Sequence, residues 1–156
     1  MAKDLLGKYL VRSKDGKKKR FKIVETESYG GYKDKASHSS RGKTKRNEVM
    51  FDEPGRAYVY FTYGMHYMLN IVCGREGYPA AVLIRGIEGC IGPGRLTKKL
   101  EIGKSLNGKV LSKKSGLWIE DSPSKISGRA IARTPRIGVD SSGPVWSKKL
   151  YRFILK

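Results

Sequence analysis

The sequence predicts a single mixed α/β (α+β) domain over residues 1–156, in which strands outnumber helices. A chain of 156 residues suits one domain. Its hydrophobic fraction of 38%, with 10% aromatics, is enough to build a core, which excludes a wholly disordered basic tail. Short apolar runs separated by glycine and proline turns recur along the chain, whereas helical signals are few.

The first expected element is a β-hairpin. Residues 8–12 and 20–28 are rich in strand formers, and a Lys-Asp-Gly turn signal at 14–16 separates them. The polar, basic stretch from 30 to 46 contains several glycines and predicts a long loop, a kind of segment that tends to carry function. Residues 46–51 then predict one helical turn, which the Pro-Gly pair at 54–55 ends.

The middle and the end of the chain predict further short elements. Strands are expected at 57–62 and 67–73 around a Tyr-Gly-Met-His turn, and at 80–85 after a turn at 74–79. Gly-Pro-Gly at 92–94 opens a helix at 95–102 that Gly103 ends. Strands are also expected at 117–120, 136–139 and 151–155.

The charge indicates a polyanionic partner. The net charge is +19, and it divides into +9 over residues 1–50, +2 over 51–100 and +8 over 101–156. A field of this strength attracts nucleic acid and opposes self-association, so a monomer is expected. Basic flanks around a nearly neutral, aromatic centre suit a protein that grips phosphates with its ends. A ribosome-associated RNA-binding protein fits the composition equally well.

Other classes are disfavoured. No apolar run approaches the roughly 18 residues of a membrane span, and the first residues lack the apolar stretch of a signal peptide, so no membrane partner and an intracellular place are expected. Cys73 and Cys90 lack metal-type spacing and are expected to be buried free thiols. With His38 and His66 as the only histidines, no metal site is expected.

A cluster of acids and aromatics follows the second expected strand. Alternation along a strand places Glu25, Glu27 and Tyr29 on one face, and His38 follows nine residues later. A carboxylate there, if it lies over a cleft, can act as a general base on water. Arg85, at the end of an apolar strand, needs a carboxylate if it is buried, and Glu27 is one candidate. The alternative is that these are ordinary surface charges.

Tyrosines dominate a second cluster, between residues 58 and 70. Tyr58 and Tyr60 alternate onto one strand face, and Tyr63 precedes a glycine at an expected turn tip. Flat rings with a polar end suit unstacked bases and can fill the gap that such bases leave. A tyrosine-rich core strand is the competing interpretation, mainly for Tyr58 and Tyr67. Asn70, inside an apolar run, is either structural or reads a base edge.

Several segments form an ordered set of motifs. They are Ile-Val-Glu-Thr-Glu-Ser-Tyr at 23–29, Ala-Ser-His at 36–38, Lys-Arg-Asn at 45–47, Pro-Gly at 54–55, Tyr-Val-Tyr-Phe-Thr-Tyr-Gly-Met-His at 58–66, Val-Leu-Ile-Arg at 82–85, Gly-Pro-Gly-Arg-Leu at 92–96 and Arg-Ile-Gly-Val at 136–139. In this order they resemble the alkyladenine DNA glycosylase family, also called the 3-methyladenine or methylpurine DNA glycosylase family. The resemblance runs nearly end to end and is more specific than any one motif.

The resemblance implies a fold and an activity. The implied fold is one domain with a curved antiparallel β-sheet and few flanking helices. The implied activity is that of a monofunctional DNA glycosylase without a cofactor, which flips a damaged purine out of double-stranded DNA and hydrolyses its N-glycosidic bond. The implied lesions are alkylated or deaminated purines of the 3-methyladenine, 7-methylguanine, hypoxanthine and ethenoadenine class.

The resemblance also implies roles for residues. Glu27 matches the family's catalytic glutamate, which deprotonates the water that attacks the sugar C1′, and Arg85 matches the arginine that helps to hold that water. The implied base pocket consists of Tyr29, His38, Tyr60 and Asn70, of which Asn70 disfavours guanine. Tyr63 is implied to enter the duplex, and further DNA contacts are expected from Lys45, Arg46, Met65 and Arg95.

The chain departs from the family in length. The family usually continues before the position of Ala2 and carries a helical insertion between the arginine strand and Gly-Pro-Gly, whereas residues 88–91 bridge the two directly here. We therefore expect an abbreviated member. The alternative is a non-catalytic, basic DNA- or RNA-binding module on the same fold, although a mere binder has no need of the carboxylate of Glu27 facing phosphates.

Overall fold

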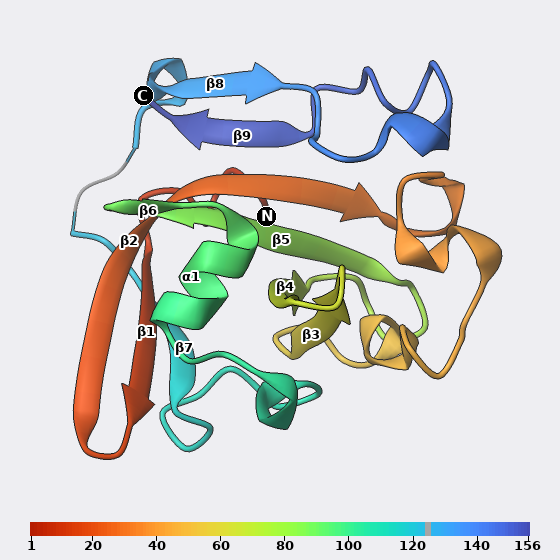
Figure 1. The fold of residues 1–156 in the computed structure, drawn as a ribbon. Coiled ribbons are helices and arrows are strands. Elements are labelled where there is room, and N and C mark those ends of the chain that lie inside the picture. The colour runs from red at the N-terminus through yellow and green to blue at the C-terminus, as the bar shows by residue number, and fades with distance from the viewer. Residues whose placement is uncertain (124–125) are drawn as a thin grey trace.

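The structure, a computed structural model, describes residues 1–123 and 126–156 and confirms a sheet-dominated mixed fold with a curled antiparallel sheet (Figure 1). The described residues form nine strands and one α-helix. The elements are β1 (Tyr9–Lys14), β2 (Lys17–Gly30), β3 (Ala57–Thr62), β4 (His66–Val72), β5 (Ala80–Ile87), β6 (Cys90–Ile91), α1 (Pro93–Lys99), β7 (Leu117–Glu120), β8 (Ile131–Thr134) and β9 (Arg152–Leu155).

The long strand β2 joins the two halves of the sheet. Its first part pairs with β1, and its second part pairs with β5 on one side and with β9 on the other. Between the two parts, the β2–β5 register shifts around Glu25, as in a β-bulge. A bulge bends a strand and increases its twist. The sheet therefore curls around β2, as Figure 1 shows, with order β3-β4-β5-β2-β1-β7 and with β9 and β8 beyond the bend.

The helix α1 covers β4 and β5 next to the core. Leu96 and Leu100 are fully buried, and the Thr97 hydroxyl donates to the Tyr67 carbonyl over 2.8 Å. Gly94 lies so close to the His66 ring that an added Cβ would come within 2.6 Å of it, so glycine is required there. Among the residues described, no helix has the length and apolar character to cross a membrane.

The polar segment between β2 and β3 is held by Asn47. This buried side chain donates from Nδ2 to the carbonyls of His38 (2.9 Å) and Gly42 (3.0 Å), and its Oδ1 accepts from the Thr44 amide (2.7 Å). Short 3-10 turns at Gly31–Lys33, His38–Arg41 and Glu48–Phe51 interrupt the segment, and the last confirms the expected helical turn. The expected long loop is therefore ordered by side-chain hydrogen bonds.

Some predicted boundaries are wrong. Residues 136–139 form no strand; β8 precedes them and ends before Pro135, which has no amide hydrogen to extend the pairing. The helix spans Pro93–Lys99 instead of 95–102, because Pro93 sets its first turn. The two-residue strand β6 was not predicted. The expected hairpin, the central strands and β7 are confirmed to within a few residues.

The Asn47→Ala variant should be less stable, because three hydrogen bonds are lost and the partners that remain buried are left unpaired. We expect the free energy of unfolding to fall by about 1–3 kcal/mol. Urea denaturation measures this loss, and Glu48→Ala, an exposed neighbour, serves as the control with a change within about 0.5 kcal/mol. Equal stability of the two variants would contradict the role of Asn47.

Candidate active site

A cavity of about 310 Å³ opens at the end of β2, a volume within the range of ligand sites. Its walls come from several elements that are distant in sequence: β2, the segment before β3, β3, β4, β5, the start of α1 and residues 137–139. The residues that line it include Tyr29, Ser37, His38, Met50, Tyr58, Tyr60, Tyr63, Met68, Asn70, Arg85, Pro93 and Val139. The structure thus brings every expected base-pocket residue to one cavity.

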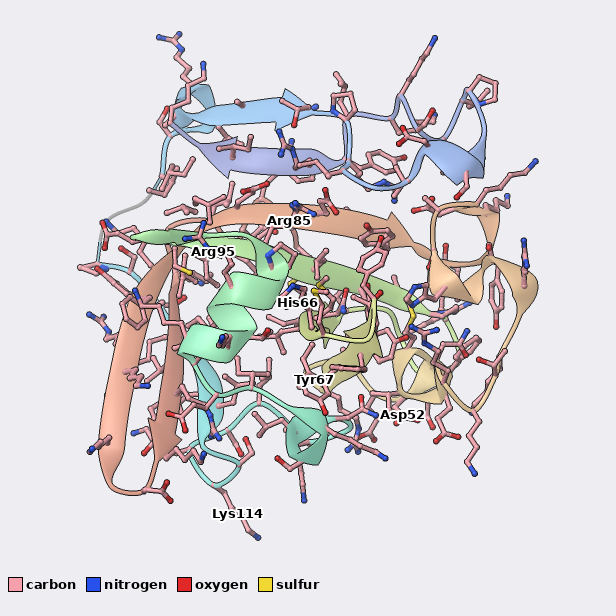
Figure 2. All side chains as sticks on the ribbon, in the orientation of Figure 1. Asp52, His66, Tyr67, Arg85, Arg95 and Lys114 are labelled. Carbon is pink, nitrogen blue, oxygen red and sulfur yellow. The ribbon has the colours of Figure 1, made fainter. Side chains whose placement is uncertain are left out.

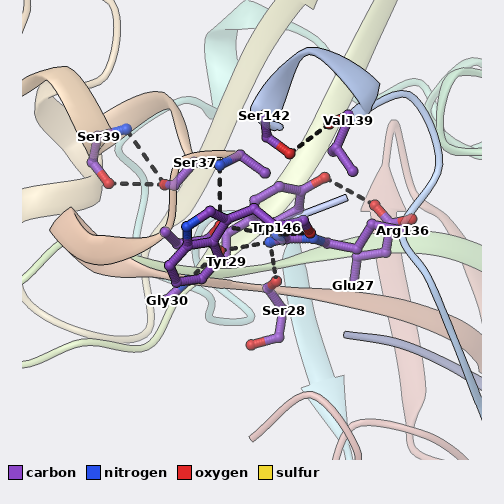
Figure 3. Close-up of polar contacts among 12 residues, drawn as sticks. Glu27, Ser28, Tyr29, Gly30, Ser37, Ser39, Arg136, Val139, Ser142 and Trp146 are labelled. Carbon is purple, nitrogen blue, oxygen red and sulfur yellow. Dashed lines mark hydrogen bonds and ion pairs between the residues drawn. The ribbon is translucent and has the colours of Figure 1, made fainter. Parts of the chain in front are cut away.

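Glu27 lies behind this cavity, with its side chain fully buried. Its Oε1 accepts from the Ile137 amide over 2.9 Å and lies 3.5 Å from Arg85 Nη1, and its Oε2 accepts from the Tyr29 hydroxyl over 2.9 Å. Burial raises the pKa of Glu27, and the Arg85 charge, the Ile137 amide and the Tyr29 hydroxyl oppose that rise. The carboxylate is therefore shielded from solvent, but its charged form has three specific partners, of which Figure 3 shows the Tyr29 hydroxyl.

Arg85 is shared between two buried carboxylates. Its Nε lies 3.0 Å from Glu25 Oε1, closer than its Nη1 lies to Glu27, and Arg152 Nη1 reaches the same Glu25 oxygen at 3.1 Å. Glu25 and Glu27 therefore share one face of β2, as alternation predicts. The alternative that they are surface charges is wrong, since both are buried.

The aromatic wall is built from the segment before β3 and from β3 itself. The His38 and Tyr60 ring centroids are 4.6 Å apart in an edge arrangement, and His38 Nδ1 is hydrogen-bonded to the Tyr58 hydroxyl at 3.0 Å. Partial burial of the ring, followed by the Arg46 charge, lowers the pKa of His38, so the neutral imidazole is favoured. Burial raises the pKa of Tyr60 to about 12. Tyr58, 1% exposed, is both core residue and cavity wall.

Tyr63 stands at the tip of the β3–β4 hairpin and is 79% exposed. Its φ of 53° and that of Gly64, 65°, place both residues in the left-handed region, which matches the twist of a tight hairpin turn. The Met65 amide closes this turn by donating to the Thr62 carbonyl. An aromatic residue in this conformation is strained, and such strain is concentrated at functional sites. Phe61 and Met65 are exposed beside it.

Asn70 forms part of the cavity wall from β4. Its side chain is buried, and its Nδ2 donates to the Tyr58 carbonyl over 3.3 Å. This bond fixes the amide from one side and ties the two tyrosine-bearing strands together. Asn70 therefore has a structural partner and also faces the cavity.

The expected DNA-contacting residues lie outside the cavity on exposed surface. Arg46 donates to the Phe61 carbonyl over 3.1 Å, and its guanidinium lies 5.6 Å from the centre of the Tyr60 ring. Arg95 is exposed on the first turn of α1, where Figure 2 labels it. Lys45 is exposed next to Arg46, but the structure does not bring it to the cavity wall.

The sequence does not predict that residues 136–139 contact Glu27, because their pattern indicates a strand. Arg136 is buried against Asp34, and the next amide, that of Ile137, reaches Glu27. The sequence signal is the Arg-Ile-Gly-Val motif itself, which marks the segment but does not show where its groups point.

Comparison with known proteins identifies the family. The family model described as methylpurine-DNA glycosylase (MPG) matches residues 1–90 and 88–156. This chain belongs to the methylpurine-DNA glycosylase family. The two matched segments overlap at 88–90, in the short connection between β5 and β6.

Sequences similar to this methylpurine-DNA glycosylase match it over most of its length. A protein of Methanocella arvoryzae is 44% identical over 92% of this chain and 80% of its own length. A protein of Anaeromyxobacter dehalogenans is 44% identical over 100% of this chain and 77% of its own length. A protein of Carboxydothermus hydrogenoformans is 44% identical over 100% of this chain and 88% of its own length. Each is named "Putative 3-methyladenine DNA glycosylase". The chain is accordingly a DNA N-glycosylase, a hydrolase that acts on DNA.

The cavity of this glycosylase offers no metal-binding cluster. Across residues 1–123 and 126–156, no group of three or more His, Cys, Asp and Glu side chains is placed to hold a metal ion. The charged groups at the cavity are instead paired with one another, carboxylate to arginine.

The His38 pKa tests the description of the aromatic wall. We expect its pKa to lie below 6.5 in an NMR titration, and the Arg46→Gln variant to raise it, because a nearby positive charge is removed. Lys43→Gln, which removes a charge from the same segment, is the control and should leave the His38 pKa in place. If Arg46→Gln also leaves it in place, Arg46 does not lie near the imidazole in solution.

Proposed function

We propose that this glycosylase flips alkylated or deaminated purines, of the 3-methyladenine, 7-methylguanine, hypoxanthine and ethenoadenine class, out of duplex DNA and hydrolyses their N-glycosidic bond. The observation that carries the proposal is the buried Glu27 carboxylate paired with Arg85, which lines a cavity with aromatic walls. The names of the relatives support the 3-methyladenine part of this range.

In the proposed reaction Glu27 is the general base. Glu27 Oε2 accepts one hydrogen bond in the free protein, so it has acceptor capacity for a water molecule that Arg85 helps to orient. The water oxygen attacks C1′ of the sugar, its proton passes to Glu27, and the electron pair of the C1′–N bond leaves with the base. A cationic alkylated base leaves directly as a neutral purine, whereas a neutral base such as hypoxanthine takes up one proton from solvent as it leaves. The products are a free purine and an abasic site. A carboxylate whose pKa lies nearer the working pH is the better proton acceptor.

The aromatic rings hold the flipped base in this proposal. The His38 and Tyr60 rings meet edge to face, 4.6 Å apart at 68°, so no base inserts between them and the two rings form one side of the pocket. Tyr29, which comes from β2 and lines the same cavity, provides a second ring for stacking. Stacking on such rings contributes about 1–3 kcal/mol per base, and a cationic alkylated base gains further attraction to their faces. The Asn70 amide then faces the edge of the base and disfavours guanine.

The surface around the cavity fits duplex DNA. Tyr63, exposed and held in a tight turn, fills the space that the flipped base leaves. Arg46, Lys45 and Arg95 bind the flanking phosphates without regard to sequence, and Met65, exposed beside Tyr63, contacts the duplex. The net charge of +19 attracts DNA and opposes self-association, so we propose that the protein acts as a monomer. It would act where the DNA is held, in the cytoplasm of a prokaryote or in a nucleus.

The Glu27→Gln variant tests the mechanism. Gln cannot accept the proton of water, so we expect the single-turnover release of purines from duplex DNA carrying 3-methyladenine, hypoxanthine or ethenoadenine to fall by about 10²- to 10⁴-fold. Glu101→Gln, which removes an exposed carboxylate paired with Lys14 and Lys19, should retain the wild-type rate.

The outcomes separate the two functional classes. A wild-type protein that binds duplex DNA but releases none of these purines is the non-catalytic binding module. A Glu27→Gln variant as active as the wild type rejects Glu27 as the base. Release of one lesion alone narrows the substrate class to that lesion.

The Tyr63→Ala variant tests the wedge. Loss of the ring should reduce excision from paired DNA by about tenfold more than excision from single strands, because only a duplex leaves a gap in its stack. Tyr63→Phe keeps the ring and is the matched control, expected to stay near the wild-type rate. Equal losses on both substrates would remove the wedge role.

A further inference from the structure

Asp34 and Arg136 form a buried ion pair next to the cavity. Arg136 Nη1 lies 2.6 Å from Asp34 Oδ2 and Nη2 lies 2.9 Å from Oδ1, so the two groups meet by two parallel hydrogen bonds. Their side chains are 0% and 1% exposed. The pair links the segment between β2 and β3 to the segment after β8, which belong to distant parts of the chain.

The same guanidinium supports a wall of the cavity. Arg136 Nη1 also donates to the Ser28 carbonyl over 2.9 Å, and the guanidinium carbon lies 4.7 Å from the centre of the Tyr29 ring and 5.2 Å from that of Tyr151. Tyr29 lines the cavity, and its hydroxyl donates to Glu27. Arg136 thus lies against the Tyr29 ring, whose hydroxyl is bonded to Glu27, the proposed general base (Figure 3).

The residue that follows Arg136 contacts the carboxylate directly. The Ile137 amide donates to Glu27 Oε1 over 2.9 Å. Since residues 136–139 form no strand, sheet pairing does not set the position of this amide. The preceding side chain, Arg136, is held by Asp34 and by the Ser28 carbonyl.

We propose that Arg136, held by Asp34, is a positioning residue for excision: it places the Ile137 amide on Glu27 and the Tyr29 ring against the flipped base. The inference rests on the proposed function of Glu27 and Tyr29. It concerns how these groups are aimed, since Arg136 itself is fully buried and does not line the cavity.

The chemistry of the pair favours this role over simple stabilisation. A buried ion pair is often no more stabilising than apolar side chains of the same volume. The Nε of Arg136 is also buried without a hydrogen-bond partner among the described residues, an unfavourable arrangement. An apolar side chain cannot provide the directional contacts that the guanidinium makes with Asp34, Ser28 and Tyr29.

The charge of Arg136 also acts on Glu27. The groups that lower the pKa of Glu27 are Arg85 from β5, the Ile137 amide, the Tyr29 hydroxyl from β2 and Arg136, and burial acts against them. Loss of Arg136 removes one of these contributions and loosens the Ile137 amide. The pKa of Glu27 then rises further, and the pH below which excision fails moves to a higher value, because the base must be ionised.

The experiment compares Arg136→Gln with Arg12→Gln. Arg12 is a second buried arginine with an unpartnered Nε, but it lies in β1 and donates to the carbonyls of Ser13 and Gly116. Single-turnover release of methylated purines from duplex DNA treated with dimethyl sulfate is measured as a function of pH. Affinity is measured on a duplex with one tetrahydrofuran abasic analogue, and the Glu27 pKa by carboxyl NMR.

We expect Arg136→Gln to lower the release rate by about 100-fold, since a displacement of 1 Å at a reacting group can have that effect. The low-pH limb of its rate profile, called the acid limb, should move to higher pH, and its Glu27 pKa should rise. Its affinity for the abasic duplex should stay within about threefold of wild type. Arg136→Lys retains the charge without the two parallel hydrogen bonds, so its release rate should lie between those of the wild type and Arg136→Gln. Arg12→Gln should keep the wild-type rate and acid limb even if it melts earlier.

Two results overturn the inference: an unchanged rate and acid limb in folded Arg136→Gln, or equal losses of rate and abasic-duplex affinity. If Arg136→Gln does not fold, the same readings on Arg136→Lys decide, and wild-type behaviour of that variant overturns the inference. If the wild-type protein releases no purine, the proposed function fails, and the NMR pKa of Glu27 alone decides whether Arg136 positions it.

Discussion

Burial of the Glu27 carboxylate is the constraint on which the rest of this structure depends. An isolated charge in a protein interior is very unfavourable, so it requires an opposite charge and hydrogen-bond donors with good geometry. The chain supplies them from three separate elements: Arg85 from β5, the Tyr29 hydroxyl from β2 and the Ile137 amide from the segment after β8. The curled sheet and the connection between β8 and β9, residues 135–151, together bring these elements to one point.

The same balance extends to the neighbouring charges. Three buried carboxylates and three arginines near the cavity balance one another in charge: Glu25 and Glu27 pair with Arg85 and Arg152, and Asp34 pairs with Arg136. The large positive excess of the chain therefore lies on the surface, where it attracts DNA phosphates. Long-range attraction and local chemistry are thus carried by different residues.

The methylpurine-DNA glycosylase fold is kept here with a short connection between β5 and β6. The Gly92 amide donates to the Arg85 carbonyl over 2.9 Å, so the start of α1 stays next to the arginine strand without an inserted helix. Pro93 then lines the cavity, and Gly94 packs on His66. The short connection therefore brings the start of α1 to the cavity wall.

Local sequence rules determined much of this protein. Alternation placed Glu25, Glu27 and Tyr29 on one face of β2, and the Tyr-Gly pair determined the exposed hairpin tip, because both features depend on neighbouring residues alone. Only the tertiary structure decided which charges pair. Arg85 lies closer to Glu25 than to Glu27, and Asp34 meets Arg136 across 102 residues of chain. Residues 136–139 show the same limit: their apolar pattern predicted a strand, but Pro135 and the buried Arg136 bond directed the segment to the carboxylate instead. Such pairings depend on contacts between distant segments, which a local pattern cannot encode.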